Sequence, residues 1–129
     1  MNRDELVALA IKARRLAYTP YSHYKVGAAL LGKSGKVYLG CNVENASYSL
    51  TCCAERTAVF KAVSEGETEF EAIAVVTKNG GSPCGACRQV LSEFAPELVV
   101  YIADKDNHIK MTSIKKLLPA AFGPKFLPG

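Results

Sequence analysis

The most informative residues of the sequence are Cys53-Ala54-Glu55 and Pro83-Cys84-Gly85-Ala86-Cys87, with 27 residues (56–82) between them. As a pattern they form C-x-E-x27-P-C-x-x-C. Three thiolates can hold a zinc ion and leave its fourth position open to water, which zinc makes acidic enough to act as hydroxide near neutral pH. A carboxylate beside that position, here Glu55, can carry the proton. The pattern therefore predicts a hydrolytic zinc site.

An alternative is a closed structural site in which Cys52 adds a fourth sulfur ligand. Structural zinc sites usually space their cysteines as C-x2–4-C, and adjacent cysteines rarely turn both thiols toward one ion. The open site is therefore the better interpretation, although spacing alone does not choose between Cys52 and Cys53. The cysteine that is not a ligand, like Cys41, is expected to be a small buried apolar residue.

Outward from these motifs, hydrophobic spacing and turn residues predict alternating helices and strands. Asn2 followed by Glu5 is typical of a helix start, and Gly32-Lys33-Ser34-Gly35 is typical of a hairpin turn. The expected helices are 2–18, 53–65, 85–94 and 114–118, and the expected strands are 25–31, 36–41, 72–77, 98–103 and 109–111. This order implies an α/β fold with three α-β-α layers around a mixed five-stranded sheet. Both cysteine motifs then lie in loops that lead into helices, where such sheets bind ligands.

Composition limits the possible classes of protein. With 129 residues, 49% of them hydrophobic, the chain is expected to form a single domain over residues 1–129. A net charge of +4 from scattered basic residues gives little support for a nucleic-acid partner. No apolar run approaches the ~20 residues of a membrane span, and the start Met-Asn-Arg-Asp-Glu is too acidic for a signal or transit peptide. Five cysteines, an odd number, argue against a disulfide framework, so a cytoplasmic protein with free thiols is expected.

Four stretches of the chain resemble the small cytidine deaminases. They are PYSHYKVGAA (20–29), GCNVENA (40–46), CAERTA (53–58) and SPCGACRQ (82–89). The last two stretches are typical of zinc deaminases in general. The first two narrow the resemblance to the short, homotetrameric nucleoside deaminases, and the match covers nearly the whole chain. The C-A-E pattern of that family implies Cys53, Cys84 and Cys87 as the ligands of one zinc ion per chain.

The resemblance also implies roles for the residues beside the zinc ligands. Glu55 is implied to be a proton shuttle that serves the water, ring N3 and the leaving amine in turn, where the alternative is an ordinary first-turn helix acid. Three thiolates outweigh one Zn²⁺, and two helix starts would offset part of that charge. Arg56 is implied to donate to the ligand sulfurs, with a surface salt bridge as its alternative. Arg88 is a weaker candidate for the same task.

Substrate contacts are implied in the same way. Asn42 and Glu44 match the pair that holds the ribose 3′-hydroxyl, with turn chemistry as the alternative. Tyr24 stands where the family has an aromatic ring, usually phenylalanine, against the pyrimidine, and its hydroxyl has no assigned role; core packing is the alternative. The backbone N–H of Ala54 corresponds to a contact with the pyrimidine O2. Phe122, in a tail that aligns loosely, corresponds to an aromatic ring that reaches a neighbouring subunit's site.

The implied activity is zinc-dependent hydrolytic deamination of cytidine and deoxycytidine to uridine and deoxyuridine, with release of ammonia, in pyrimidine salvage. The implied assembly is a homotetramer with shared active sites, without nucleic-acid or membrane partners. A deaminase of polynucleotides is one alternative, but it needs a basic channel and a pocket for a flipped base. The others are a deaminase of an antibiotic nucleoside and a non-catalytic zinc-binding module, which an intact Glu55 opposes.

Overall fold

A computed structural model describes residues 1–128, so Gly129, the last residue of the predicted domain, lies outside the described residues. In chain order the elements are α1 (Arg3–Arg14), β1 (Gly27–Gly32), β2 (Val37–Cys41), α2 (Ala54–Ser64), β3 (Phe70–Val76), α3 (Gly85–Phe94), β4 (Val99–Ala103), β5 (Ile109–Ser113) and α4 (Ile114–Leu117). Short 3-10 turns, η1 and η2, occupy Tyr48–Leu50 and Pro124–Phe126. Neither 3-10 turn was predicted from the sequence.

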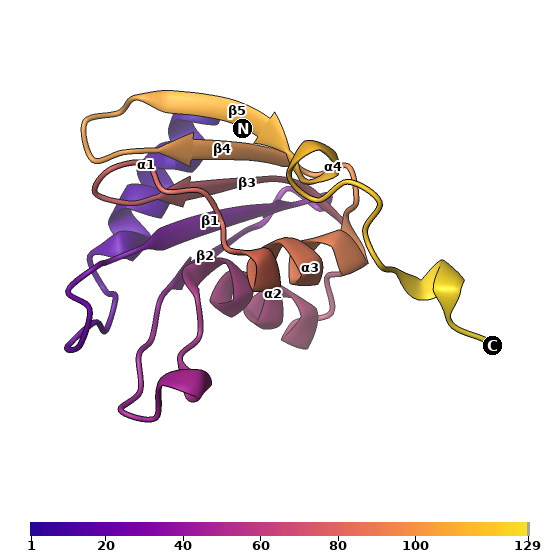
Figure 1. The fold of residues 1–129 in the computed structure, drawn as a ribbon. Coiled ribbons are helices and arrows are strands. Elements are labelled where there is room, and N and C mark those ends of the chain that lie inside the picture. Colours follow the sequence, from indigo (N-terminus) through magenta and orange to yellow (C-terminus); the bar gives the residue numbers. More distant parts are fainter. Residues whose placement is uncertain (129) are drawn as a thin grey trace.

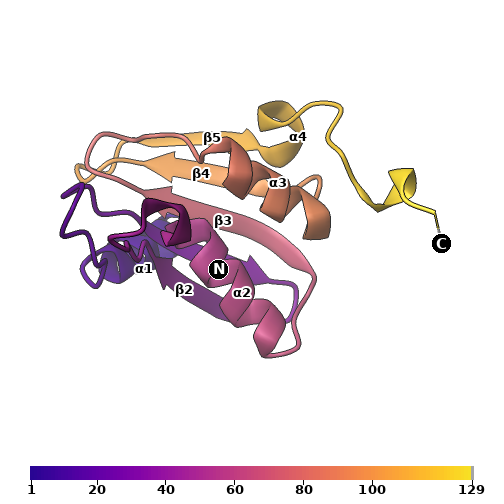
Figure 2. The ribbon, with the colours of Figure 1, turned by 60° about the horizontal axis from the view of Figure 1, so that its bottom comes forward.

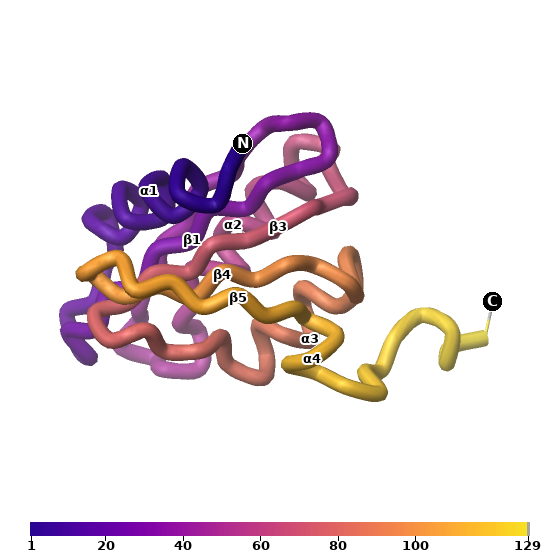
Figure 3. The backbone as a smooth tube through the Cα atoms, turned by 90° about the horizontal axis from the view of Figure 1, so that it is seen from above, coloured from indigo at the N-terminus to yellow at the C-terminus, as the bar shows by residue number. Residues whose placement is uncertain are grey.

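The strands form one mixed sheet with the order β2-β1-β3-β4-β5. Strand β1 pairs antiparallel with β2 and β3, β3 runs parallel to β4, and β4 pairs antiparallel with β5. Helix α1 covers one face of the sheet, while α2 and α3 lie side by side on the other (Figures 1 and 2). Figure 3 shows α1 alone on its own face. The predicted three-layer α/β fold is confirmed.

The two central strands supply both layers of the core, because successive side chains of a strand point to opposite faces. Leu30 and Ile73 face α2 and α3, whereas Leu31 and Ala74 face α1. All six residues of β1 are buried. A sheet buried on both faces gives the loops at its edge a rigid base.

Gly40 brings the start of α2 directly onto the sheet. A Cβ added at Gly40 would lie 2.4 Å from the carbonyl oxygen of Ala54 and 2.6 Å from the backbone nitrogen of Ala58. The helix can approach β2 this closely only because Gly40 has no side chain. The contact fixes the height of the first turn of α2, which carries half of the cysteine motif.

Every predicted end except that of the first helix lies within two residues of the observed one, and visible contacts explain the shifts at two of the ends. Helix α1 ends at Arg14 because the backbone of Tyr18 pairs with that of Asn42 and Glu44. Strand β1 begins at Gly27 rather than at residue 25, since the backbone N–H of Val26 donates to the Asn42 side chain at 2.9 Å. In both cases a contact between distant segments overrides the local pattern.

Within residues 1–128, no helix has both the length and the apolarity that crossing a lipid bilayer demands.

Candidate active site

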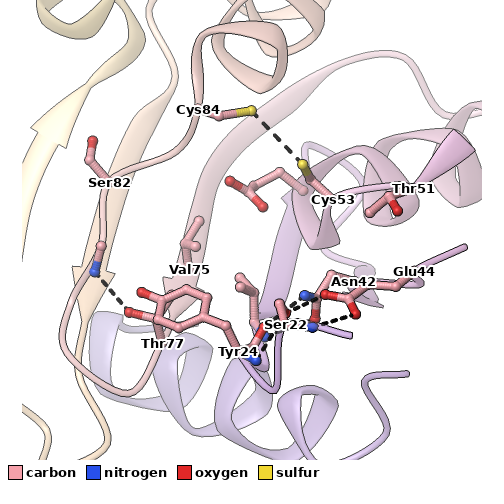
Figure 4. A pocket seen from close by; sticks show the side chains of 13 residues that line it. Ser22, Tyr24, Asn42, Glu44, Thr51, Cys53, Val75, Thr77, Ser82 and Cys84 are labelled. Atoms are coloured by element: carbon pink, nitrogen blue, oxygen red, sulfur yellow. Dashed lines mark hydrogen bonds between the residues drawn. The ribbon is translucent and has the colours of Figure 1, made fainter. Parts of the chain in front are cut away.

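The two cysteine motifs meet where α2 and α3 begin. Cys53 caps the start of α2, Cys84 caps the start of α3, and Cys87 is buried in the first turn of α3. The Sγ atoms of Cys53 and Cys84 are 3.8 Å apart, and those of Cys84 and Cys87 are 3.4 Å apart. All three sulfurs lie within 4.8 Å of one another. Figure 4 shows the Cys53 and Cys84 sulfurs facing each other across the gap between the two helices.

These sulfurs fit a zinc ion. Tetrahedral zinc with Zn–S bonds of about 2.3 Å has ligand sulfurs roughly 3.8 Å apart, close to the observed spacing. Cys52 does not join them, since its Sγ accepts from the hydroxyl of Thr57 at 3.6 Å and contacts the Cys53 carbonyl oxygen at 3.7 Å. The closed four-cysteine alternative therefore has no support in this geometry. Cys52 and Cys41 are only half-buried, so the expectation that they are buried apolar residues is wrong.

Protonation of the thiols also indicates a cation site. The pKa of Cys53 falls to about 5 because its sulfur accepts hydrogen bonds from Cys87 and from Arg56. The pKa of Cys87 rises because this thiol donates to Cys53 and is buried beside Glu55. Sulfurs this close cannot all become thiolates without a positive partner between them. A divalent cation that prefers thiolate ligands is the group that this set of donors fits.

Arg56 supplies part of the missing positive charge. Its guanidinium Nη2 donates to Cys53 Sγ at 3.5 Å and to the carbonyl oxygen of Thr51 at 3.3 Å. The hydrogen bond to Cys53 raises the pKa of Arg56, so the guanidinium stays charged. Its Nε atom is buried and has no hydrogen-bond partner among the described residues. The geometry thus places Arg56 against the Cys53 sulfur rather than in a surface salt bridge.

Arg88 lies elsewhere and holds a loop. It donates to the carbonyl oxygens of Pro83 and Leu117, both at 2.8 Å, and to the hydroxyl of Ser82 at 3.0 Å. These contacts tie the segment before Cys84 to the end of α4. Arg88 therefore positions the backbone that carries a proposed zinc ligand, and none of its three contacts is to a sulfur.

A cavity of about 300 Å³ opens in front of the sulfurs, and such a volume suits a small molecule. Its lining residues come from every segment that the sequence motifs marked, and Figure 4 shows most of them. They are Ser22, Tyr24, Val26, Asn42, Glu44, Thr51, Cys53, Glu55, Val75, Thr77, Gly81, Ser82 and Cys84.

Glu55 lies at the sulfur end of this cavity. Its residue is only 4% exposed, although it belongs to the first turn of α2. Burial raises the pKa of its carboxyl to about 7. An ordinary first-turn helix acid lies in solvent, where it remains an anion. Glu55 is therefore placed to exchange protons with a ligand in the cavity.

Asn42 and Glu44 lie at the other end of the cavity. Glu44 accepts hydrogen bonds from the backbone N–H groups of Tyr21 and Ser22 at 3.0 and 3.1 Å, and from the Ser22 hydroxyl. The bond from Ser22 lowers the pKa of Glu44, which keeps it an acceptor. The Asn42 side chain accepts from the Val26 N–H and donates to the Tyr24 carbonyl oxygen, both at 2.9 Å. The Asn42 side chain thus holds the backbone of Tyr24 and Val26 in place, and its second amide proton is left for a ligand.

Of the other predicted contact residues, Tyr24 lines the cavity and Phe122 does not. The Tyr24 ring extends along the cavity toward the loop that contains Ser82 (Figure 4). Ala54 is the first residue of α2, where a backbone N–H has no carbonyl partner in its own helix. Phe122 is 56% exposed on the tail after α4, stacked on Phe126 and tied to Gln89 through its carbonyl oxygen.

Several cavity residues escaped the sequence analysis. They are Ser22, Val26, Thr51, Val75, Thr77, Gly81 and Ser82. Three of them lie inside stretches that carry the family resemblance, namely Ser22, Val26 and Ser82. Thr77 and Gly81 could have been found only from their position at and after the end of a buried strand, just before the P-C-x-x-C motif.

Comparison with known proteins agrees with this geometry. The family described as "Cytidine and deoxycytidylate deaminase zinc-binding region" matches residues 1–103. A cytidine deaminase of Sporosarcina psychrophila is 52% identical over 98% of this chain and 96% of its own, and one of Halalkalibacterium halodurans is 54% identical over 95% of both chains.

Solved structures give the same result. The crystal structure of a cytidine deaminase from Burkholderia pseudomallei has a TM-score of 0.91 and 51% identity over 95% of this chain and all of its own. That of cytidine deaminase from Mycobacterium tuberculosis has a TM-score of 0.84 and 42% identity over 95% of this chain and 98% of its own. With the three sulfurs, the buried glutamate and the fold already in place, the chain belongs to the cytidine and deoxycytidylate deaminase family, whose zinc-binding region it carries.

Proposed function

We propose that this protein deaminates cytidine and deoxycytidine hydrolytically to uridine and deoxyuridine, releasing ammonia, as a step of pyrimidine salvage. The observation that carries the proposal is the buried Glu55 carboxyl, which shares one small cavity with the three-sulfur cluster. Family membership supports the same reaction.

Cys53, Cys84 and Cys87 hold the zinc ion, one per chain. Zinc bound there supplies Lewis acidity that makes water a nucleophile near neutral pH. Arg56 donates to Cys53 Sγ, which withdraws electron density from that sulfur and preserves the acidity. The starts of α2 and α3 add partial positive charge at the same point.

Glu55 moves the protons. Its carboxylate takes one proton from the attacking water and gives it to ring N3 as the new C4–O bond forms. It then takes the second proton of the former water and gives it to the amine, so that the C4–N bond breaks and ammonia leaves. One carboxylate can serve all of these steps if it lies within hydrogen-bond reach of each atom.

The remaining lining residues orient the nucleoside. Glu44 accepts a hydrogen bond from the ribose. Its carboxylate is already oriented for this by hydrogen bonds from Tyr21 and Ser22. Asn42 contributes its free amide proton beside it. Tyr24 packs its ring against the pyrimidine, and the unpaired N–H at Ala54 donates to the pyrimidine O2. Because the ribose and the pyrimidine each have their own partners in the cavity, we expect it to favour a whole nucleoside over a free base.

The proposed assembly is a homotetramer with shared sites, in a reducing cytoplasm. Phe122, Phe126 and Leu127 are all more than half exposed on a tail that runs away from the sheet (Figure 1). Exposed apolar groups in series are typical of a surface that another chain covers. All five cysteines are free thiols, which a reducing compartment preserves.

The experiment is an ultraviolet assay for loss of cytidine absorbance, run with and without a zinc chelator. We expect turnover of cytidine and deoxycytidine, loss of turnover with chelator, and recovery when zinc is returned. A cytosine-containing oligonucleotide and an antibiotic nucleoside serve as competing substrates in parallel. Preference for the oligonucleotide, or turnover that survives complete removal of zinc, would contradict the proposal.

A further inference from the structure

The loop between β3 and Cys84 is held at its centre by one side chain from a distant segment. Tyr24 donates its hydroxyl to Asn79 Oδ1 at 2.7 Å, 55 residues along the chain. Inside the loop, the Gly81 N–H donates to Thr77 Oγ1 at 2.8 Å. Thr77 and Gly81 line the cavity, and so does Tyr24 itself. One wall of the cavity therefore depends on where this hydroxyl sits.

Gly81 leaves room for that hydroxyl because it has no side chain. A Cβ added at Gly81 would lie 2.7 Å from the Tyr24 hydroxyl oxygen, but 3.9 Å from the ring carbon that bears it. The second distance is an ordinary contact, so only the oxygen excludes a side chain. Gly81 is also absent from the glycines with positive φ, which are Gly35, Gly66 and Gly80. Alanine at position 81 is therefore opposed by the Tyr24 hydroxyl and not by the backbone.

The loop has a second, separate anchor next to the zinc ligand. Arg88 binds the Pro83 carbonyl oxygen and the Ser82 hydroxyl, so the backbone entering Cys84 is fixed without Tyr24. The Tyr24 hydroxyl thus holds the middle of the loop, which forms the cavity wall. Arg88 holds the end of the loop next to Cys84. Loss of the hydroxyl should alter how a nucleoside sits and leave zinc content unchanged.

We propose that the Tyr24 hydroxyl is a positioning group that, with Asn79 and Gly81, sets the pyrimidine-side wall of the cavity. The inference rests on the proposed function, since it assumes that a nucleoside occupies this cavity. The ring of Tyr24 remains the surface that meets the base, and the hydroxyl acts through the loop. A group that shapes the wall without touching reacting atoms supports ground state and transition state alike, so its loss raises KM and spares kcat.

The first test is Tyr24→Phe, Asn79→Ala and the double variant, assayed for cytidine deamination. Each single change should raise KM by roughly 3- to 10-fold, as expected for one hydrogen bond, with kcat within about twofold. Both changes remove the bond from Tyr24, and Asn79→Ala also removes the 3.5 Å contact from the Thr77 hydroxyl. The double variant should therefore be no worse than Asn79→Ala alone. Tyr38→Phe is the matched control, since it removes a 2.9 Å bond from the hairpin to Glu67, away from the cavity, and should leave KM unchanged.

The second test is rescue. Gly81→Ala should raise KM by about tenfold or more in the presence of Tyr24, and adding Tyr24→Phe should bring KM back down by several-fold. Elemental analysis and thermal melting confirm that each variant retains zinc and folds. Unchanged KM in Tyr24→Phe, or costs that simply add in the Gly81 pair, would overturn the inference. An inactive unmutated protein would instead overturn the proposed function, so the two failures are distinguishable.

Discussion

Among single residues, one carboxyl carries most of the proposed chemistry. Glu55 is at the start of a helix, a common place for an acid, yet it is buried in the cavity beside the sulfurs. Its position is what separates a proton shuttle from an ordinary capping acid. Glu5 offers the contrast, because it lies in the first turn of α1 and is exposed.

Glu55→Gln should retain zinc and lower kcat by roughly 10²–10⁴-fold or more, because the amide cannot exchange the protons that the reaction requires. Elemental analysis and steady-state kinetics measure the two effects. Glu5→Gln is the matched control and should turn over like the unmutated protein. Near-normal kcat in a zinc-loaded Glu55→Gln variant would remove Glu55 from the mechanism.

Zinc content should distinguish the proposed ligand cysteines from Cys52. Cys84→Ala or Cys53→Ala should lose most of the metal and lower the melting temperature, because two sulfurs hold zinc poorly and the starts of α2 and α3 lose their common partner. Cys52→Ala is the control, as its sulfur lies outside the cluster, and it should keep one zinc per chain. Full zinc in Cys84→Ala, or loss of zinc in Cys52→Ala, would contradict the proposed ligand set.

At the scale of elements, patterns in the sequence predicted the helices and strands well and the loops poorly. Helix α3 begins and ends where its periodicity and Pro96 place it. The cavity wall, in contrast, depends on bonds such as that from Tyr24 to Asn79, between segments that local patterns do not connect. The family resemblance supplied the site residues within its motifs but assigned no partner to the Tyr24 hydroxyl. Only the folded arrangement brings that pair together.

The hairpin of β1 and β2 likewise depends on a side chain from a distant segment, that of Glu67. Glu67 accepts hydrogen bonds from the Ser34 backbone N–H at 2.9 Å, the Ser34 hydroxyl at 2.6 Å and the Tyr38 hydroxyl at 2.9 Å. These bonds, those of Ser34 first, lower the pKa of Glu67 below its ordinary value of 4.5. A carboxyl with a lowered pKa in the folded state stabilises the protein above its unfolded pKa, and that contribution is lost as pH falls through the folded value.

Glu67→Gln should therefore lower the melting temperature at neutral pH by a few degrees. The gap between variant and unmutated protein should narrow as pH falls below about 4.5, because protonation weakens the same acceptor in Glu67 itself. Thermal melts from pH 7 to pH 3 measure this. Glu69→Gln, at an exposed position two residues away, is the control and should change little. A gap that stays constant over this range would mean that the charge of Glu67 does not support the hairpin.

At the scale of the whole molecule, the tail is the feature that a single chain does not explain. After α4 it runs away from the sheet (Figure 2). The rings of Phe122 and Phe126 stack on each other, with their centroids 5.8 Å apart. The cavity is lined by residues from Ser22 to Cys84, so among the described residues the tail contributes nothing to its own site. Under the proposed assembly, the tail of a neighbouring chain would close the cavity and exclude bulk water during proton transfer.

If Phe122 serves a neighbour, two inactive variants should complement each other. Glu55→Gln removes the chemistry of its own site but can still lend Phe122, whereas Phe122→Ala spoils only the site of its neighbour. Refolding the two together should give mixed tetramers in which intact Glu55 meets intact Phe122, so activity should exceed the average of the separately refolded variants. The matched control mixes Phe122→Ala with a chain that carries both substitutions. That chain has no Phe122 to lend, so its mixture should show no recovery. Equal activity in the two mixtures, with mixed tetramers confirmed by mass, would place Phe122 in its own chain and end the case for shared sites.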